Sequence, residues 1–322
     1  MGAAFHLGEI FAMRIQLPAA LLATALAGSL FAAPAQAAAP RTFVSAAGSD
    51  ANNCINVATP CRHLSTAYAA TAANGEIYVL DPANYGSLTI TGPVSIEGHG
   101  WASIAPASGN AAITINANPG DKINIIGVVL DGTAITNTNG IVFNSGGTLN
   151  VQDSVIRNFS SRGIYFTPSG SSQIFISNTL IADNGDQGIY IFSSGSQTVS
   201  GTLDRVRLQF NANDGLRVTY AANANITVSD SVSTNNGFGI TAFATSSSST
   251  VFVRNSVIAN SSNTGLVANG VGAVIWVTRS TITGNALDWS TANGGAVTSY
   301  SDNNFDANAS SNPASLSPAT YK

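Results

Sequence analysis

The sequence repeats itself about every 25 residues. The segment VQDSVIRNFSSRGIYF at 151–166 has a precursor and five later relatives, which begin at 125, 176, 203, 228, 253 and 277. The third residue of each copy serves as a marker, and it advances by 26, 25, 27, 25, 25 and 24 residues through Gly127, Asp153, Asn178, Arg205, Asp230, Asn255 and Arg279. So short and steady a period is typical of a solenoid, in which each repeat forms one turn and packs only against its neighbours.

Each repeat contains three short runs that alternate apolar and polar residues. In the rung that contains the copy at 151–166, Leu149 and Val151 are the apolar residues of the first run, Ile156 is that of the second, and Ile164 and Phe166 are those of the third. Alternation with a period of two indicates strands with one buried face, and no run is long enough for a convincing helix. The repeat therefore predicts an all-β parallel β-helix with three strands per rung.

A polar residue recurs five positions after the marker. It is asparagine or aspartate in four copies, at Asn158, Asp183, Asn235 and Asn260. These residue types tolerate left-handed backbone at a turn and bond to nearby backbone groups. We therefore interpret this column as a structural corner, in which stacked side chains form an amide ladder, rather than as a catalytic site.

The N-terminus has the organisation of a secretory signal. Met13 and Arg14 begin a short basic region, an apolar run follows, and Ala35-Gln36-Ala37 resembles a cleavage site. We expect a signal peptide at 1–37, with Met13 as the true start, and a secreted chain that is periplasmic or extracellular. A membrane anchor is the alternative, but Pro18 interrupts the apolar run, so no transmembrane anchor is expected after cleavage.

The rest of the chain divides into a cap, a body and a tail. We expect an N-terminal cap at 38–75, because a solenoid needs its exposed core covered at the ends. The stretch 63–74 (HLSTAYAATAAN) is the one helical-looking segment and suits that cap. The β-helix is expected at 76–306, and a mobile C-terminal tail at 307–322.

Charge is scarce along the whole chain. Of the 322 residues, 9% are charged, against about 25% in an ordinary soluble domain, and the formal net charge is −4. The only lysines are Lys122 and Lys322, so there is no basic stripe of the kind that nucleic acid requires. A polyanionic polysaccharide would be a poor electrostatic match unless a cation bridged it. We expect a monomer that does not bind nucleic acid.

The two cysteines, Cys54 and Cys61, lie close together in the expected cap. An export signal implies an oxidising compartment, so they are predicted to form a disulfide. Closing so short a loop stabilises the fold by about 2.5 kcal/mol on the loop-entropy model. The alternative is a metal site that includes His63, but it lacks a fourth ligand, and no metal is expected there.

The opening and the repeats together resemble a known group. The segment RTFVSAAGSDANNC…TPCRHLSTAYAA…GEIYVLDPANYGSLTI resembles the N-terminal region of secreted bacterial right-handed parallel β-helix repeat proteins of the pectin-lyase-like superfamily. The resemblance covers roughly 41–306 and implies a right-handed parallel β-helix. It says little about activity, because the superfamily includes lyases, hydrolases, epimerases, tailspikes and adhesins.

Pectate lyases of this group bind calcium through clustered acids. Here Asp183 and Asp186 share one turn, and Asp214 lies one rung further on. A calcium site with oxygen ligands is one interpretation of this patch. The interpretation that we favour makes these acids turn residues that pair with arginines, without a bound cofactor. The arginines are Arg162, Arg205 and Arg217.

Polygalacturonases of this group carry a paired-Asp motif, a Gly-His-Gly and an Arg-Ile-Lys. The chain has Gly98-His99-Gly100 on an early rung, but it has neither of the other two motifs. Inverting hydrolysis needs two carboxylates that flank the cleaved bond, and the sequence does not place such a pair. We therefore interpret His99 as a turn residue, and no catalytic motif is identified.

Outward-facing residues form vertical columns, with one residue per rung. One column reads Tyr165, Tyr190 and Arg217. A second contains Phe175, Phe252 and Trp276, with two threonine rungs between the phenylalanines. Aromatic residues in a line indicate recognition, and rings one rung apart could stack against sugars. The alternative is lateral stacking that merely protects the sheet.

Three functions remain open at this stage. The first is a secreted, non-catalytic protein that binds a polysaccharide or a cell-surface glycan through its outward columns. The second is a polysaccharide lyase or glycoside hydrolase that acts in a groove on the β-helix. The third is a structural protein of the envelope or matrix. Aromatic columns without a catalytic constellation favour the first.

Overall fold

The computed structural model describes residues 1–2, 38–106, 109, 111–133, 136, 138–193, 195–220, 223–244 and 248–320. From Ala38 onward the chain forms one compact unit. The predicted signal peptide, including the proposed start at Met13, falls outside the described residues except for Met1 and Gly2. Within the described part, no helix is long and apolar enough to cross a membrane.

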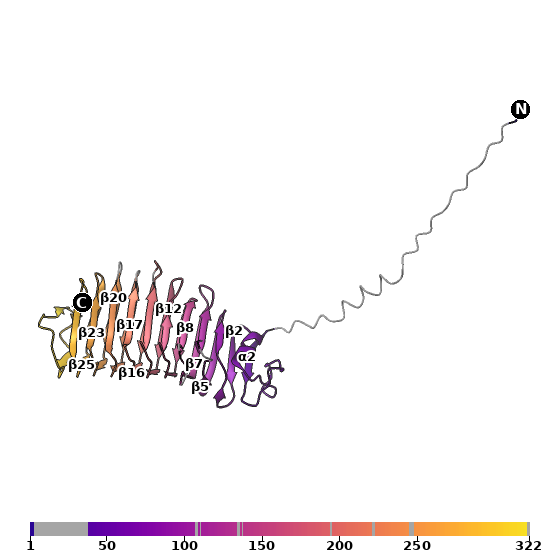
Figure 1. Ribbon diagram of the computed structural model, residues 1–322, viewed down its shortest axis with the longest axis horizontal. Coiled ribbons are helices and arrows are strands. Elements are labelled where there is room, and N and C mark those ends of the chain that lie inside the picture. Colours follow the sequence, from indigo (N-terminus) through magenta and orange to yellow (C-terminus); the bar gives the residue numbers. More distant parts are fainter. Residues whose placement is uncertain are drawn as a thin grey trace. The chain divides into compact units, whose positions relative to one another are not determined.

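The compact unit is a parallel β-helix whose rungs have three faces (Figure 1). Face 1 precedes each marker residue and consists of β1 (Ala39–Val44), β2 (Thr71–Val79), β5 (Val94–Ile104), β7 (Lys122–Asp131), β9 (Thr148–Gln152), β12 (Ser172–Ser177), β15 (Val199–Asp204), β18 (Ala224–Ser229), β21 (Ser249–Arg254), β24 (Ala273–Thr278), β27 (Ala296–Ser299) and β29 (Ser317–Pro318). Face 2 follows the marker and consists of β3 (Ala83–Asn84), β10 (Val155–Arg157), β13 (Leu180–Ala182), β16 (Arg207–Gln209), β19 (Val232–Thr234), β22 (Val257–Ala259), β25 (Thr281–Thr283) and β28 (Asn304–Asp306).

Face 3 is a separate sheet. It consists of β4 (Leu88–Ile90), β6 (Ile113–Asn116), β8 (Ile141–Ser145), β11 (Ile164–Phe166), β14 (Ile189–Ser193), β17 (Asp214–Tyr220), β20 (Phe238–Ala244), β23 (Thr264–Asn269) and β26 (Leu287–Ala292). Faces 1 and 2 share one sheet because β5 and β7 run through the corner between them and pair with strands on both faces. The predicted three-strand rung is confirmed.

The core is a stack of aliphatic side chains from all three faces. The equivalent positions Ile164, Ile189 and Leu216 pair in register on face 3, and each is fully buried. Leu149 and Val151 on face 1 are buried in the same way. Alternate residues of each short strand point inward, so every rung buries apolar surface only against its neighbours. This accounts for the period-two pattern of the sequence.

The corner between faces 1 and 2 is the marker column. Its residues have left-handed backbone, with φ of +50° at Asp153, +47° at Asn178 and +51° at Arg205. A single left-handed residue turns the chain from one face to the next. Most markers are asparagine, aspartate or glycine because these residues adopt this conformation with the least strain.

The corner between faces 2 and 3 corrects the expected amide ladder. Asn158, Asp183 and Asn235 do have left-handed backbone, but the buried ladder lies one residue later. Asn184 Nδ2 donates to Asn211 Oδ1 at 2.8 Å, and Asn211 Nδ2 donates to the next amide in the column at 3.0 Å. The left-handed residue points outward and the next residue points inward, so only the second of each pair can be buried. The buried members of the column are Asn184, Asn211, Asn236 and Asn285.

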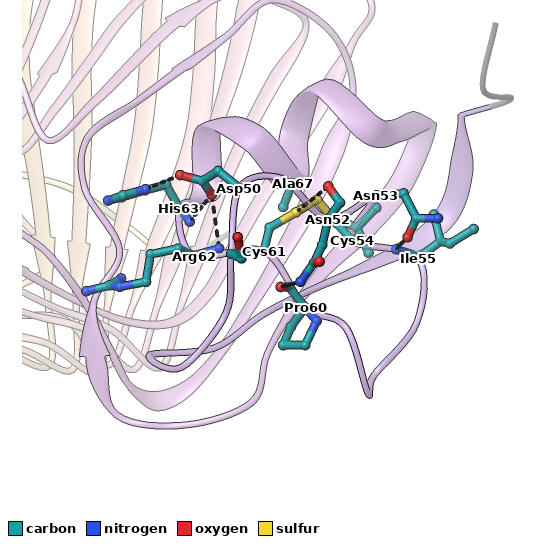
Figure 2. The surroundings of a disulfide bond; sticks show 12 residues. Asp50, Asn52, Asn53, Cys54, Ile55, Pro60, Cys61, Arg62, His63 and Ala67 are labelled. Atoms are coloured by element: carbon teal, nitrogen blue, oxygen red, sulfur yellow. Dashed lines mark hydrogen bonds and ion pairs between the residues drawn. A yellow bond between two sulfur atoms is a disulfide. The ribbon is translucent and has the colours of Figure 1, made fainter. Parts of the chain in front are cut away.

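The N-terminal cap contains a disulfide between Cys54 and Cys61, with the Cα atoms 4.9 Å apart. Both thiols are used in it, which removes them from the alternative metal site. Figure 2 shows Asp50 beside the disulfide. Asp50 Oδ1 accepts hydrogen bonds from the backbone N of Arg62 and of His63, both at 3.0 Å, and Oδ2 lies 2.5 Å from His63 Nδ1.

The cap helix is shorter than the sequence predicts. α2 spans Leu64–Ala70, and Thr71 already begins β2 and pairs with Ala39 of β1. Leu64 and Ala67 are the buried side of the helix. The residues that follow, although helical in composition, pair with β1 instead, so tertiary pairing overrides propensity.

The C-terminal segment lies against the last rung over its described residues, up to position 320. Ala309 N donates to Asn285 O and Ala319 N donates to Ser299 O, both at 2.8 Å. Asn308 extends the buried amide column, because its Oδ1 accepts from Asn285 Nδ2 at 3.0 Å. The segment predicted to be a tail therefore adds a partial rung at this end, and its mobility remains a prediction.

Candidate functional site

The strands β11, β14 and β17 place Tyr165, Tyr190 and Arg217 in one outward column on face 3. Tyr165 pairs in register with Tyr190, and Tyr190 pairs with Arg217. The two tyrosine rings stack with centroids 5.7 Å apart and planes 16° apart. The structure thus brings together the three residues that the repeat placed in a column.

Arg162 completes this site from the turn before β11. Its guanidinium carbon lies 4.8 Å from the centroid of Tyr165 and 5.0 Å from that of Tyr190, so one cation covers both rings. Arg162 Nη2 lies 2.9 Å from Asp186 Oδ2, and Nε donates to Gln187 Oε1 at 2.7 Å. The guanidinium is therefore fixed on three sides.

Arg217 extends the site by one rung. Its guanidinium carbon lies 5.9 Å from the centroid of Tyr190 and 6.0 Å from that of Phe243, and Nε donates to Thr219 Oγ1 at 3.2 Å. Its Nη1 lies 3.6 Å from Asp214 Oδ2. We call Arg162, Tyr165, Asp186, Tyr190 and Arg217 the tyrosine–arginine cluster.

Asp214 lies beneath this cluster with only 1% of its surface exposed. Its Oδ1 accepts a hydrogen bond from Thr241, whereas Oδ2 has no hydrogen-bond partner among the described residues. Burial raises the pKa of this carboxyl, although Thr241 and Arg217 act in the opposite direction. A carboxylate so deeply buried cannot touch a polysaccharide, so we assign it a structural role.

Asp214 gives the protein a predictable dependence on pH. The folded state binds this proton more tightly than the unfolded state, in which the carboxyl of Asp214 has a pKa of 3.8. The free energy of unfolding therefore rises as pH falls through the raised pKa, and the rise is complete below pH 3.8. Asp214→Asn cannot titrate, so its free energy of unfolding relative to that of the natural chain should be highest at pH 7. Urea unfolding at neutral and mildly acidic pH measures this difference, which should shrink on acidification. An equal difference at both pH values would contradict it.

The acidic patch predicted from Asp183, Asp186 and Asp214 does not assemble into a shared site. Asp186 pairs with Arg162 and Asp214 lies near Arg217, while Asp183 is exposed at the corner. Among the described residues, no group of three or more His, Cys, Asp or Glu side chains could hold a metal ion. The pairing of acids with arginines thus holds for two of the three aspartates. The third expected arginine, Arg205, pairs with Asp204 instead.

The second predicted column gains an aromatic residue that the sequence did not reveal. Phe252 and Trp276 pair in register on face 1, while Phe175 lies apart from them, beyond the threonine rungs. Tyr300 lies 6.3 Å from Phe252 and 6.1 Å from Trp276 between ring centroids. Tyr300 follows β27 on the next rung, where the sequence has diverged from the repeat and no longer predicts strand positions.

Two hollows flank face 1 at β9, β12 and β15. One, of about 430 Å³, is lined by hydroxyl and amide side chains and by Lys122. The other, of about 240 Å³, lies at the first corner and is lined in part by Asp153, Asn178, Arg205 and Arg207. Neither contains a pair of carboxylates that could flank a glycosidic bond.

His99 lies within β5, at the corner where this strand bends from face 1 to face 2, which agrees with the turn that its Gly-His-Gly setting predicts. Its φ is +54°, and its ring lies between Tyr78, at 4.3 Å, and Trp101, at 5.3 Å, between centroids. Its nearest carboxylate is that of Glu97, whose Oε1 is 3.6 Å from Nδ1. This arrangement makes an aromatic corner near the cap, with the carboxylate of Glu97 beside the imidazole.

A family model and the solved structure of a pectate lyase support the fold. A family model described as "Right handed beta helix region" matches residues 107–252. The solved structure of pectate lyase Pel9A superposes with a TM-score of 0.53 at 13% identity, covering 80% of this chain and 74% of that one. The A-module of the Azotobacter vinelandii mannuronan C-5 epimerase AlgE4 gives a TM-score of 0.47 at 13% identity, over 77% and 91% of the two chains. No curated protein matches the sequence. The expected right-handed parallel β-helix is confirmed.

Proposed function

We propose that this right-handed parallel β-helix protein of the pectin-lyase-like superfamily is a secreted protein that binds a polysaccharide through its outer surface without cleaving it. The observation that carries the proposal is the tyrosine–arginine cluster. It is a rigid group of aromatic, cationic and anionic side chains on adjacent strands of face 3. Such a preformed surface loses little conformational entropy on binding.

The geometry of the cluster suggests how it would bind. The faces of the two tyrosine rings are covered by each other and by Arg162, so a sugar cannot stack flat between them. Neither tyrosine hydroxyl has a hydrogen-bond partner in the described part of the chain, and neither is a buried unsatisfied group. Two hydroxyls one rung apart, with the guanidinium of Arg217 beyond them, can bond to sugar hydroxyls. Recognition would therefore occur through hydrogen bonds at the ring edges.

The surroundings of the cluster favour a neutral glycan. Asp186 balances the charge of Arg162, and the whole chain carries a net charge of −4. One protein with this fold is a pectate lyase, so the scaffold is compatible with a polysaccharide partner. The described residues lack a catalytic pair of exposed carboxylates at the cluster, which favours binding over cleavage. The aromatic group at Phe252 and Trp276 would add a second contact on face 1.

A Tyr165→Phe/Tyr190→Phe double variant tests this proposal. It keeps the stacked rings and removes both hydroxyls, so affinity for a retained glycan should fall about tenfold to a hundredfold if each lost bond is worth about 1 kcal/mol. Affinity electrophoresis on β-glucan, mannan, xylan, pectate and alginate gels measures the change. Thr281→Val, which removes a hydroxyl from face 2, is the control and should bind like the natural chain.

Three results would contradict the proposal. Unchanged retardation of the double variant would remove the cluster from recognition. Failure of the natural chain to bind any of these glycans would favour a structural role in the envelope or matrix. New reducing ends, or unsaturated products that absorb in the ultraviolet, would identify a hydrolase or a lyase. The thermal unfolding transition of the double variant should stay close to that of the natural chain.

A further inference from the structure

One residue of the second corner does not fit its position. From Asn158 to Ala307, the corner column between faces 2 and 3 has left-handed backbone, and most of its members are asparagine, aspartate or glycine. Phe210 takes this position on the β16 rung with φ of +54°. A bulky side chain in left-handed backbone is strained, and such outliers gather at functional sites. The neighbours show that an asparagine would fit there.

Burial does not explain the phenylalanine either. Its side chain is 57% exposed, and no ring contact or cation–π contact involves it in the described part of the chain. The inward position of this corner belongs to the next residue, Asn211, which is buried. Phe210 thus has two costs for folding: its backbone is strained, and its apolar ring is exposed to water. Among the described residues, no aromatic or cation–π contact offsets either cost.

The rungs on either side of Phe210 carry polar residues at the equivalent corner position. Asp183 N donates to Gln209 O at 3.1 Å and Phe210 N donates to Thr234 O at 3.3 Å, so the register of face 2 continues through the corner. Asp183 therefore precedes Phe210 in the column and Asn235 follows it, one rung away on each side. Both are exposed, and neither side chain makes a hydrogen bond within the described residues.

We propose that Phe210, Asp183 and Asn235 form a second glycan-binding site, separate from the tyrosine–arginine cluster. The apolar face of a hexopyranose ring would cover Phe210. The carboxylate of Asp183 and the amide of Asn235 would bond to hydroxyls on its two edges. The ligand is a neutral sugar, because the carboxylate of Asp183 would repel an acidic one. The exposed Asp183 then acts in ligand recognition rather than in metal binding.

The variant Phe210→Asn separates this role from a structural one. Asparagine relieves the left-handed strain, so the thermal midpoint should stay equal or rise. Retardation on gels of soluble β-glucan or mannan should weaken by at least tenfold, a loss that no folding defect would explain. Asn260→Ala, in the same column beyond Asn235, is the matched control and should leave retardation unchanged.

Several outcomes would overturn the proposal. Unchanged retardation of Phe210→Asn on both neutral glycans would do so, as would a lower thermal midpoint with normal binding. Failure of the natural chain to bind either glycan would contradict it as well. A lower sedimentation coefficient for Phe210→Asn would assign the ring to contact between two copies of the chain. Loss of binding in the tyrosine double variant alone would support the face 3 cluster and reject the corner site.

Discussion

Replacing Asn211 by leucine is expected to lower the free energy of unfolding by about 4 kcal/mol, the largest effect of any substitution considered for this protein. Asn211 Oδ1 accepts from Asn184 Nδ2 at 2.8 Å. Its own Nδ2 donates to Ile181 O at 3.3 Å and to Asn236 Oδ1 at 3.0 Å. Leucine would fill the space but remove these three side-chain bonds, and the buried Asn184 Nδ2 would lose its acceptor. Asn236 Oδ1 keeps the bond from the backbone N of residue 211 at 2.9 Å, and each buried group that loses its partner costs about 1–3 kcal/mol.

Thermal unfolding followed by circular dichroism measures this loss, which should lower the midpoint by about 10 °C. Asn225→Leu is the matched control, since Asn225 is exposed on β18 and its side chain has no hydrogen bond in the described structure. That change should stay within about 0.5 kcal/mol of the natural chain. Equal midpoints for the two variants would show that the amide column does not hold the rungs together.

Gly188→Ala is expected to destabilise the protein by about 2–3 kcal/mol through overpacking. A Cβ at this position would lie 2.8 Å from Asn211 Nδ2 and 2.8 Å from Gly215 O. The amide is held in the buried column and the carbonyl belongs to the next rung, so neither can move freely. The recurring turn glycine is thus needed for close approach between rungs rather than for an unusual backbone angle.

Gly170→Ala provides the comparison, because a Cβ there would meet nothing within 4 Å. It should be neutral or should stabilise by up to about 1 kcal/mol, since alanine restricts the unfolded chain. Urea unfolding of both variants distinguishes crowding from a general cost of losing glycine. A similar loss in the two variants would argue against crowding.

The sequence predicts the rung but not which corner residue is buried. Period-two alternation gives the inward positions of the strands, and the marker column coincides with the left-handed residues Asp153, Asn178 and Arg205. Alternation of apolar and polar residues stops at a corner, where adjacent residues such as Asn235 and Asn236 are both polar. The buried ladder therefore lies one residue later than composition predicts. The direction of each side chain there depends on a backbone angle that composition does not reveal.

The candidate site was predicted in part for a related reason. Vertical register follows from the repeat, so the column of Tyr165, Tyr190 and Arg217 could be derived from spacing alone. Arg162 lies in a turn, outside the strand register, and was expected only as a partner for acids. Its position over both rings depends on how its side chain extends from the turn. The position of Tyr300 does not follow from the repeat, because this residue belongs to a rung whose sequence no longer resembles the others.

Affinity electrophoresis of Arg162→Met tests glycan recognition by the tyrosine–arginine cluster most directly. Methionine keeps much of the apolar length but removes the guanidinium that covers both rings and bonds to Asp186 and Gln187. Arg205→Met is the control, since Arg205 is also a surface arginine paired with an aspartate. On a gel of the glycan that retards the natural chain most, Arg162→Met should lose most of that retardation while Arg205→Met keeps it. Equal retardation of the natural chain and Arg162→Met would contradict recognition by this cluster.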